Sequence, residues 1–184
     1  MKMEEINNVN HKIYELAKPL KNKEKTRVLF VCLGNICRSP AADGIMHAIV
    51  EREGVAADWD IDSAGTARYH IGELPDHRMR LHARRRGLDL THRARQVETA
   101  DFDRYDLIIG MDSVNVADLR RLAPSPEAER KVHAMAEFFA PGERYDYVPD
   151  PYYEGAEGFE LVLDLLEDSC QRLFNQLSRR NSTR

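Results

Sequence analysis

The sequence predicts an α/β domain of three layers, in which a four-stranded parallel sheet is covered by helices on both faces. Four short runs with strand patterns alternate along the chain with segments of helical periodicity, and this alternation is typical of βα units and a parallel sheet. The first run, residues 28–31, leads through a glycine-containing loop into a helix start, Ser39-Pro40. A chain of 184 residues has the length of one such domain.

The first half of the domain is expected to contain two strands and two helices. Residues 28–31 are a run of large apolar side chains, as a buried strand requires. Apolar residues at helical spacing follow between residues 41 and 49, and residues 58–64 predict a second strand. Residues 76–86 predict a helix that Gly87 ends, because glycine readily adopts the left-handed conformation found after helices.

The second half continues the alternation. Residues 107–110 are the clearest central strand, and a helix over residues 113–122 and a short strand over residues 132–135 follow. The last helix is predicted from a single apolar stripe. The stripe consists of Phe159, Val162, Leu163, Leu166, Cys170, Leu173, Phe174 and Leu177.

The composition changes near residue 26. Six of the seven lysines precede it, whereas the Lys and Arg residues after it are all arginine apart from Lys131. We therefore expect residues 1–26 to be an N-terminal extension outside the domain that begins at residue 27. The extension is either disordered, derived from cloning, or a short amphipathic helix that is broken at Pro19.

Charge and cysteine content argue against several classes of protein. A net charge of −4 disfavours a nucleic-acid partner or an anionic membrane surface. Three cysteines, two of them in one loop, do not make the disulfide framework of a secreted protein. No apolar stretch approaches the ~20 residues that cross a bilayer, and the first residues lack the apolar region of a signal peptide. We expect a cytoplasmic protein.

The loop over residues 32–39, Cys-Leu-Gly-Asn-Ile-Cys-Arg-Ser, has the properties of a phosphate site that carries its own nucleophile. A strand that enters a helix through such a loop directs backbone N–H groups and the positive end of the helix dipole into one concavity. Beside this positive potential the Cys32 thiol is favoured as thiolate, which is the nucleophilic form. Arg38 can hold two phosphate oxygens at once, because its guanidinium is planar.

Other positions of the loop have structural interpretations. Gly34 and Asn35 tolerate a positive φ, which the tight loop requires. Ser39 has two competing interpretations: it caps the helix, or its hydroxyl hydrogen-bonds the Cys32 thiolate. A buried structural cysteine is the alternative interpretation of Cys32, but it leaves the accompanying Arg38 and Gly34-Asn35 unexplained.

Several motifs together resemble the low-molecular-weight protein tyrosine phosphatase family, in their order and in their separations. They are the loop over residues 32–39, Ser63-Ala64-Gly65, Ile71-Gly72 with Pro75-Asp76, His92-Arg93-Ala94-Arg95-Gln96 and Asp150-Pro151-Tyr152-Tyr153. The resemblance runs from about residue 27 to the end of the last helix, and it implies a phosphatase catalytic domain over residues 27–184. It also implies hydrolysis of phosphotyrosine in proteins or peptides to inorganic phosphate. We expect a monomer without cofactor, and the histidines show no metal-ligand spacing with Cys or carboxylates.

The resemblance implies a role for individual residues. Cys32 is the nucleophile that forms a phosphocysteine, Arg38 clamps the phosphate, and Asp150 protonates the leaving group and then takes a proton from water. A further set forms or supports the phosphate loop. That set is Leu33, Gly34, Asn35, Ile36, Cys37, Ser39, Ser63 and His92. Without the Cys32 loop, Asp150 between two prolines would be interpreted as an ordinary turn residue.

Aromatic residues are expected to select the substrate. Tyr69, Tyr152 and Tyr153 fall at family positions around the entrance, where they could wall a slot deep enough for a phenyl phosphate and too deep for phosphoserine. Ile36 stands where the branch that resembles protein-arginine phosphatases carries threonine, which favours phosphotyrosine. Cys37 either packs passively or forms, as in relatives, a reversible disulfide with Cys32.

Two other functions share parts of this pattern. An arsenate reductase has the same fold and loop but needs further cysteines in a mobile segment, and no cysteine occurs between Cys37 and Cys170. A catalytically silent phosphotyrosine-binding module is expected to have lost the nucleophile or the acid. Both Cys32 and Asp150 are present, so the sequence favours the phosphatase.

Overall fold

A single parallel sheet forms the centre of the computed structural model, which describes residues 25–179. Its strands are β1 (Thr26–Cys32), β2 (Trp59–Gly65), β3 (Leu107–Gly110) and β4 (Val132–Ala134), in the order β2-β1-β3-β4. Every neighbouring pair is parallel. The predicted four-stranded parallel sheet is therefore confirmed.

The expected N-terminal extension lies outside the described residues, apart from its last two positions. Thr26 is already the first residue of β1 and pairs with Trp59 of β2. The sheet thus begins one residue before the boundary expected from the composition.

The central strand β1 explains why the sheet is covered on both faces. Val28 and Phe30 point to one face and Leu29 and Val31 to the other, and all four are completely buried. A strand that is apolar at successive positions is stable only when both of its faces are packed.

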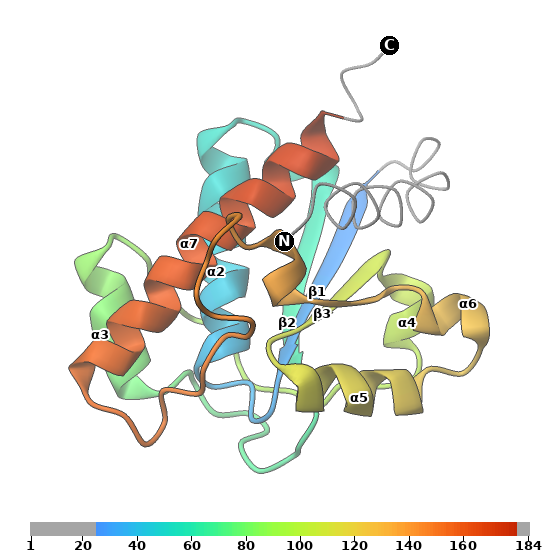
Figure 1. Ribbon diagram of the computed structural model, residues 1–184, viewed down its shortest axis with the longest axis horizontal. Helices are drawn as coiled ribbons and strands as arrows, with labels where there is room; N and C mark the ends of the chain where they lie inside the picture. The colour runs from blue at the N-terminus through green and yellow to red at the C-terminus, as the bar shows by residue number, and fades with distance from the viewer. Residues whose placement is uncertain (1–24, 180–184) are drawn as a thin grey trace.

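The first helical layer contains α2 (Arg38–Arg52), α3 (His77–Arg85) and α7 (Ala156–Ser178), which lie on the same side of the sheet (Figure 1). α2 and α7 pack in one core with Val28 and Phe30. All eight residues of the apolar stripe predicted for the last helix are buried in α7, and the predicted helix over residues 76–86 is α3 with its caps.

The second layer covers the opposite face with α4 (Asp101–Arg104), α5 (Ser113–Leu122) and α6 (Pro126–Glu129) (Figure 1). Their apolar residues share a core with Leu29 and Val31. α5 has the predicted bounds, whereas α4 and α6 are single turns that periodicity cannot reveal. The three predicted layers are confirmed. None of the helices within residues 25–179 has the length and apolar character needed to cross a membrane.

Two short 3₁₀ helices complete the part of the fold that the structure describes. η2 (Ala56–Asp58) precedes β2, and η3 (Met135–Phe138) follows β4 directly. The strand expected over residues 132–135 therefore ends at Ala134, because Met135 already belongs to η3.

The carboxyl ends of the two neighbouring strands β1 and β2 meet at Gly65. Gly65 pairs with Cys32, and its backbone also bonds the segment that carries Arg95 and Val97. A Cβ at this position would lie 2.7 Å from the carbonyl oxygen of Leu33. The loop that follows β1 can pass over β2 only because this residue has no side chain.

We expect Gly65→Ala to destabilise the protein by about 1–3 kcal/mol, since backbone rather than a flexible side chain must move to admit the methyl group. Urea unfolding measures this loss. Vanadate affinity should fall in the same variant, because the displaced backbone belongs to the loop after β1. Stability and vanadate affinity equal to those of the unmodified protein would contradict this tight approach.

Candidate active site

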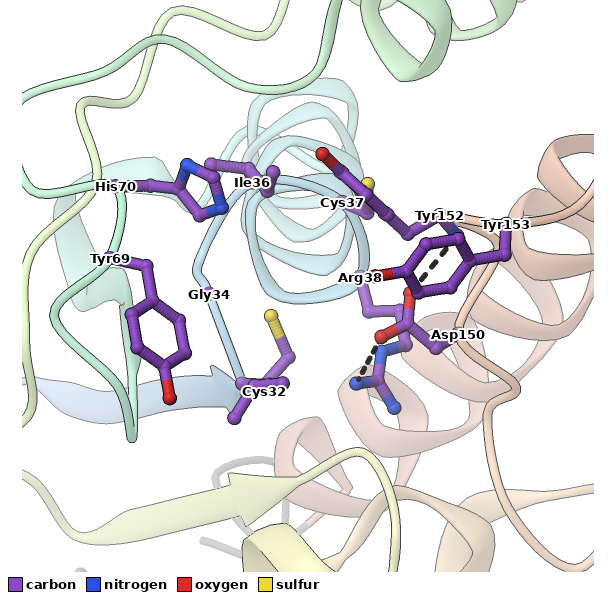
Figure 2. Close-up of a pocket in the computed structure, with 11 residues that line it drawn as sticks. Cys32, Gly34, Ile36, Cys37, Arg38, Tyr69, His70, Asp150, Tyr152 and Tyr153 are labelled. Atoms are coloured by element: carbon purple, nitrogen blue, oxygen red, sulfur yellow. Dashed lines mark hydrogen bonds and ion pairs between the residues drawn. The ribbon is translucent and has the colours of Figure 1, made fainter.

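A cavity of about 250 Å³ opens at the carboxyl end of β1 (Figure 2). Its lining comes from the loop after β1, the loop after β2 and the segment before α7. The lining residues are Cys32, Leu33, Gly34, Ile36, Cys37, Arg38, Tyr69, His70, Asp150, Tyr152 and Tyr153. Of these, only His70 was not expected from the sequence; its Nδ1 lies 2.8 Å from Glu73.

Cys32 is the last residue of β1 and is buried, with its sulfur directed into the cavity (Figure 2). The loop that follows it ends at the first turn of α2, so the thiol lies close to the positive end of a fifteen-residue helix. Its Sγ is 3.0 Å from the hydroxyl oxygen of Ser39. The site therefore offers the sulfur a hydrogen-bond partner and a favourable dipole.

The position of Ser39 decides whether its side chain caps the helix. Ser39 lies inside α2, whose N-cap is Cys37, and no side chain caps this helix. The capping interpretation is therefore wrong. The Ser39 hydroxyl has only one proton, and it lies within hydrogen-bond distance of both the Cys32 sulfur and the carbonyl oxygen of Ala64.

The side chain of Asn35 fixes the conformation of the loop through hydrogen bonds. It is the one non-glycine residue among residues 25–179 with a positive φ, 57°. Its buried amide nitrogen donates to the hydroxyls of Ser39 and Ser63, and its amide oxygen accepts from the backbone N–H of Arg95. The same oxygen lies 2.9 Å from Nε2 of His92, which must donate because this oxygen can only accept.

Arg38 is buried at the base of the cavity, where carboxylates face it. One of its terminal nitrogens donates to Asp112 at 2.6 Å and to the carbonyl oxygen of Val148, and the other donates to Asp150 at 3.3 Å. Burial by itself would lower the pKa of this guanidinium. The negative charges of Cys32, Asp112 and Asp150 outweigh burial, and the pKa is raised.

Asp112, like His70, is a site residue that sequence reasoning missed. It follows β3, the strand next to β1, and its second carboxylate oxygen caps α5 by accepting from the backbone N–H of Asn115. An acidic residue between the clearest central strand and a helix start was the available signal, because such positions lie at the same sheet edge as Cys32.

Asp150 faces the cavity from the segment before α7. One of its carboxylate oxygens contacts Arg38, and the other accepts from the backbone N–H of Tyr152. Asp150 lies across the cavity from Cys32 (Figure 2). A phosphoryl group bound between them would have the sulfur on one side and the carboxyl group near its leaving oxygen.

Tyrosines stand at two sides of the entrance (Figure 2). Tyr69 comes from the loop after β2 and is largely exposed, whereas Tyr152 and Tyr153 follow Asp150 and meet edge to face at 5.0 Å. The structure thus brings all three predicted slot residues to one cavity.

The three cysteines of the chain are free thiols. Burial raises the pKa of Cys37 well above the usual range, and the neighbouring Asp76 and Cys32 raise it further. Cys170 is completely buried in α7, where burial also raises its pKa. The reversible disulfide between Cys32 and Cys37 stays a prediction.

Within residues 25–179, one cluster has atoms close enough to ligate a metal ion, namely Asp43, Asp62 and His92. The carboxylates already have partners, since Ser63 donates to Asp43 and Arg95 donates to Asp62. Nδ1 of His92 lies 3.6 Å from Asp43 and 3.4 Å from Asp62. The cluster is linked to the loop that follows β1 through the contact of His92 with Asn35.

Comparison with known proteins matches residues 27–183 to the model of the low molecular weight phosphotyrosine protein phosphatase family. The family member from Schizosaccharomyces pombe is 42% identical over 153 residues, which cover 83% of this chain and 97% of that protein.

Solved structures show the same likeness. A protein tyrosine phosphatase from Entamoeba histolytica superposes with a TM-score of 0.81 at 38% identity, over 85% of this chain and 99% of that chain. A Drosophila arginine phosphatase superposes with a TM-score of 0.76 at 31% identity, over 84% and 98% of the two chains.

We expect Asn35→Ala and Asn35→Gly to lower both stability and vanadate affinity, because each leaves Ser39, Ser63 and His92 without their shared partner. Asn35→Ala should be the less stable of the two by about 1 kcal/mol, since alanine is strained at positive φ and glycine is not. Urea unfolding of both variants separates backbone strain from lost hydrogen bonds. Equal stability of the two variants would contradict the strained loop.

Proposed function

We propose that this chain, which belongs to the low molecular weight phosphotyrosine protein phosphatase family, hydrolyses phosphotyrosine in proteins or peptides through a phosphocysteine on Cys32. The observation that carries the proposal is the arrangement of Cys32 and Asp150 on two sides of one cavity, with Arg38 at its base. No cofactor takes part in this chemistry, and inorganic phosphate is the product.

In the first step the phosphate dianion binds to the backbone N–H groups of the loop and to Arg38. The Cys32 thiolate attacks phosphorus in line with the leaving oxygen, and the P–O bond to the tyrosyl ring breaks. Asp150 gives its proton to the departing phenolate oxygen, so that tyrosine leaves as a neutral phenol. The phosphoryl group is now bonded to sulfur.

In the second step water attacks the phosphocysteine. Asp150, now a carboxylate, takes a proton from this water, the P–S bond breaks, and the thiolate of Cys32 is restored. Arg38 contributes to both steps, because its planar guanidinium can follow the charge that spreads over the equatorial oxygens.

The slot favours phosphotyrosine over shorter phosphoamino acids. Tyr69 stands on one side and Tyr152 and Tyr153 on the other, so a phenyl ring can enter between aromatic walls. Phosphoarginine is the second candidate substrate, because one structural relative is an arginine phosphatase. The apolar Ile36 in the cavity wall favours the aromatic substrate. Turnover of phosphotyrosine, phosphoserine and phosphoarginine peptides distinguishes these candidates.

The cellular setting is part of the same proposal. We infer a monomeric catalytic domain over residues 27–184 that acts in the reducing cytoplasm, and the three free thiols support this setting. An arsenate reductase would need a further accessible cysteine to relay a disulfide. Cys170 is completely buried in α7, which disfavours that function.

We expect Cys32→Ser to abolish turnover of aryl phosphates while vanadate still binds, because backbone N–H groups and Arg38 hold the anion. Steady-state kinetics and vanadate binding by calorimetry measure the two effects. Cys170→Ala is the matched control, since it removes a thiol remote from the cavity and should keep the activity. Substantial turnover in Cys32→Ser, or no phosphoenzyme trapped in the unmodified protein, would rule out covalent catalysis.

We expect Asp150→Asn to slow phenyl phosphate by about 10²–10⁴-fold, the usual contribution of general acid catalysis, and to slow nitrophenyl phosphate much less. Nitrophenolate is a weak base and can leave without a proton. The measurement is kcat for a series of aryl phosphates against the pKa of the leaving phenol. Asp146→Asn, in the same segment but outside the cavity, should leave this dependence unchanged. If kcat depends on the pKa of the leaving phenol equally in Asp150→Asn and in the unmodified protein, another residue must be the acid.

A further inference from the structure

We propose that Arg78 is a positioning residue for the acid: it holds Tyr152, and through Tyr152 the carboxyl group of Asp150, over the phosphate loop. The inference rests on the proposed function, in which Asp150 protonates the leaving group. Arg78 lies in the first turn of α3 and touches neither Asp150 nor Cys32 in any hydrogen bond or ion pair of the described residues.

Arg78 is anchored to the phosphate loop through Asp76. The Asp76 carboxylate caps α3 by accepting from the backbone N–H of Arg78, and it also binds the guanidinium at 3.0 and 2.8 Å. Burial would raise the pKa of Asp76, but its hydrogen bonds to Arg78 outweigh burial and lower it. The backbone N–H of Asp76 donates to the carbonyl oxygen of Ile36 at 2.7 Å. The guanidinium is therefore fixed relative to the loop that binds phosphate.

The same guanidinium lies over two aromatic rings. Its central carbon lies 4.9 Å from the ring centre of Phe159, which is buried in α7, and 5.3 Å from the ring centre of Tyr152. A planar cation over an aromatic face is an attractive contact that the ammonium of lysine reproduces poorly. Arg78 thus ties the ring of Tyr152 to α3 and α7.

Tyr152 passes this restraint on to the acid. Its backbone N–H donates to one carboxylate oxygen of Asp150 at 3.1 Å, two residues earlier in the chain. The other carboxylate oxygen contacts Arg38, and a phosphate dianion in the loop competes with Asp150 for this guanidinium. The contact with Arg38 is therefore weakened when the acid is needed, whereas the path from Arg78 through Tyr152 does not involve the phosphate.

The test compares Arg78→Met and Arg78→Lys with the unmodified protein, using phenyl phosphate and nitrophenyl phosphate. We expect kcat for phenyl phosphate to fall about tenfold in Arg78→Met, as the loss of a cation–π contact of intermediate strength predicts, and kcat for nitrophenyl phosphate to fall less. Arg78→Lys should lie between. Arg84→Met is the matched control, because Arg84 is exposed on the same helix and pairs with Asp89; it should change neither rate.

A double-mutant cycle separates this role from a general structural one. In an Asp150→Asn background, Arg78→Met should cause no further loss, and vanadate affinity should be unchanged in both backgrounds. An additive loss, an equal loss for both substrates or a matching loss of vanadate affinity would overturn the inference.

If Arg78→Met does not fold, Tyr152→Leu replaces it, because it removes the contacted ring and leaves α3 intact; the same selective loss on phenyl phosphate is then expected. Its absence would overturn the inference. A failure of the proposed function is recognised separately. If Asp150 is not the acid, the Asp150→Asn variant by itself will leave the dependence of kcat on the pKa of the leaving phenol unaltered.

Discussion

The burial of one positive charge, on Arg38, is the constraint on which the rest of the site depends. Its side chain is 3% exposed, and a charge so far removed from water is tolerated only when it is paired and hydrogen-bonded. The partners are Asp112, Asp150 and the carbonyl oxygen of Val148, which lie 74 to 112 residues further along the chain. Arg38 therefore draws the end of β3 and the segment before α7 to the end of β1.

The two carboxylates on Arg38 are held differently, and this difference suits a phosphate site. Asp112 is bound at 2.6 Å and is fixed by its cap on α5, while Asp150 is bound at 3.3 Å and is 44% exposed. An incoming dianion displaces the longer and more exposed contact at the lower cost. In the proposed mechanism Asp112 then keeps the guanidinium aligned, and Asp150 becomes available to the leaving group.

The local part of this site was predictable from its own residues, whereas the long-range part either came from the resemblance to a known family or was missed. The strand, loop and helix around Cys32 follow from adjacent residues, and the resemblance to a known family supplied Asp150. Asp112 and Arg78 escaped prediction, because their roles depend on partners that only the folded sheet order and the packing of α7 bring together. Ser39 was ambiguous for a different reason. Its hydroxyl could either cap the helix or hydrogen-bond Cys32, and only the start of α2 in the structure excludes the cap.

The two halves of the site differ in how firmly the fold holds them. The phosphate loop is fixed by the buried amide of Asn35, which bonds Ser39, Ser63 and His92. Such preorganisation is effective in catalysis, because the donors need not reorient when charge develops. Asp150, the proposed acid, is 44% exposed, has two hydrogen bonds, to Arg38 and to the backbone N–H of Tyr152, and belongs to no helix or strand. In the proposed mechanism this carboxyl group gives and then takes a proton, and it gains from its exposed position provided that the proposed restraint by Arg78 limits how far it can move away from the sulfur.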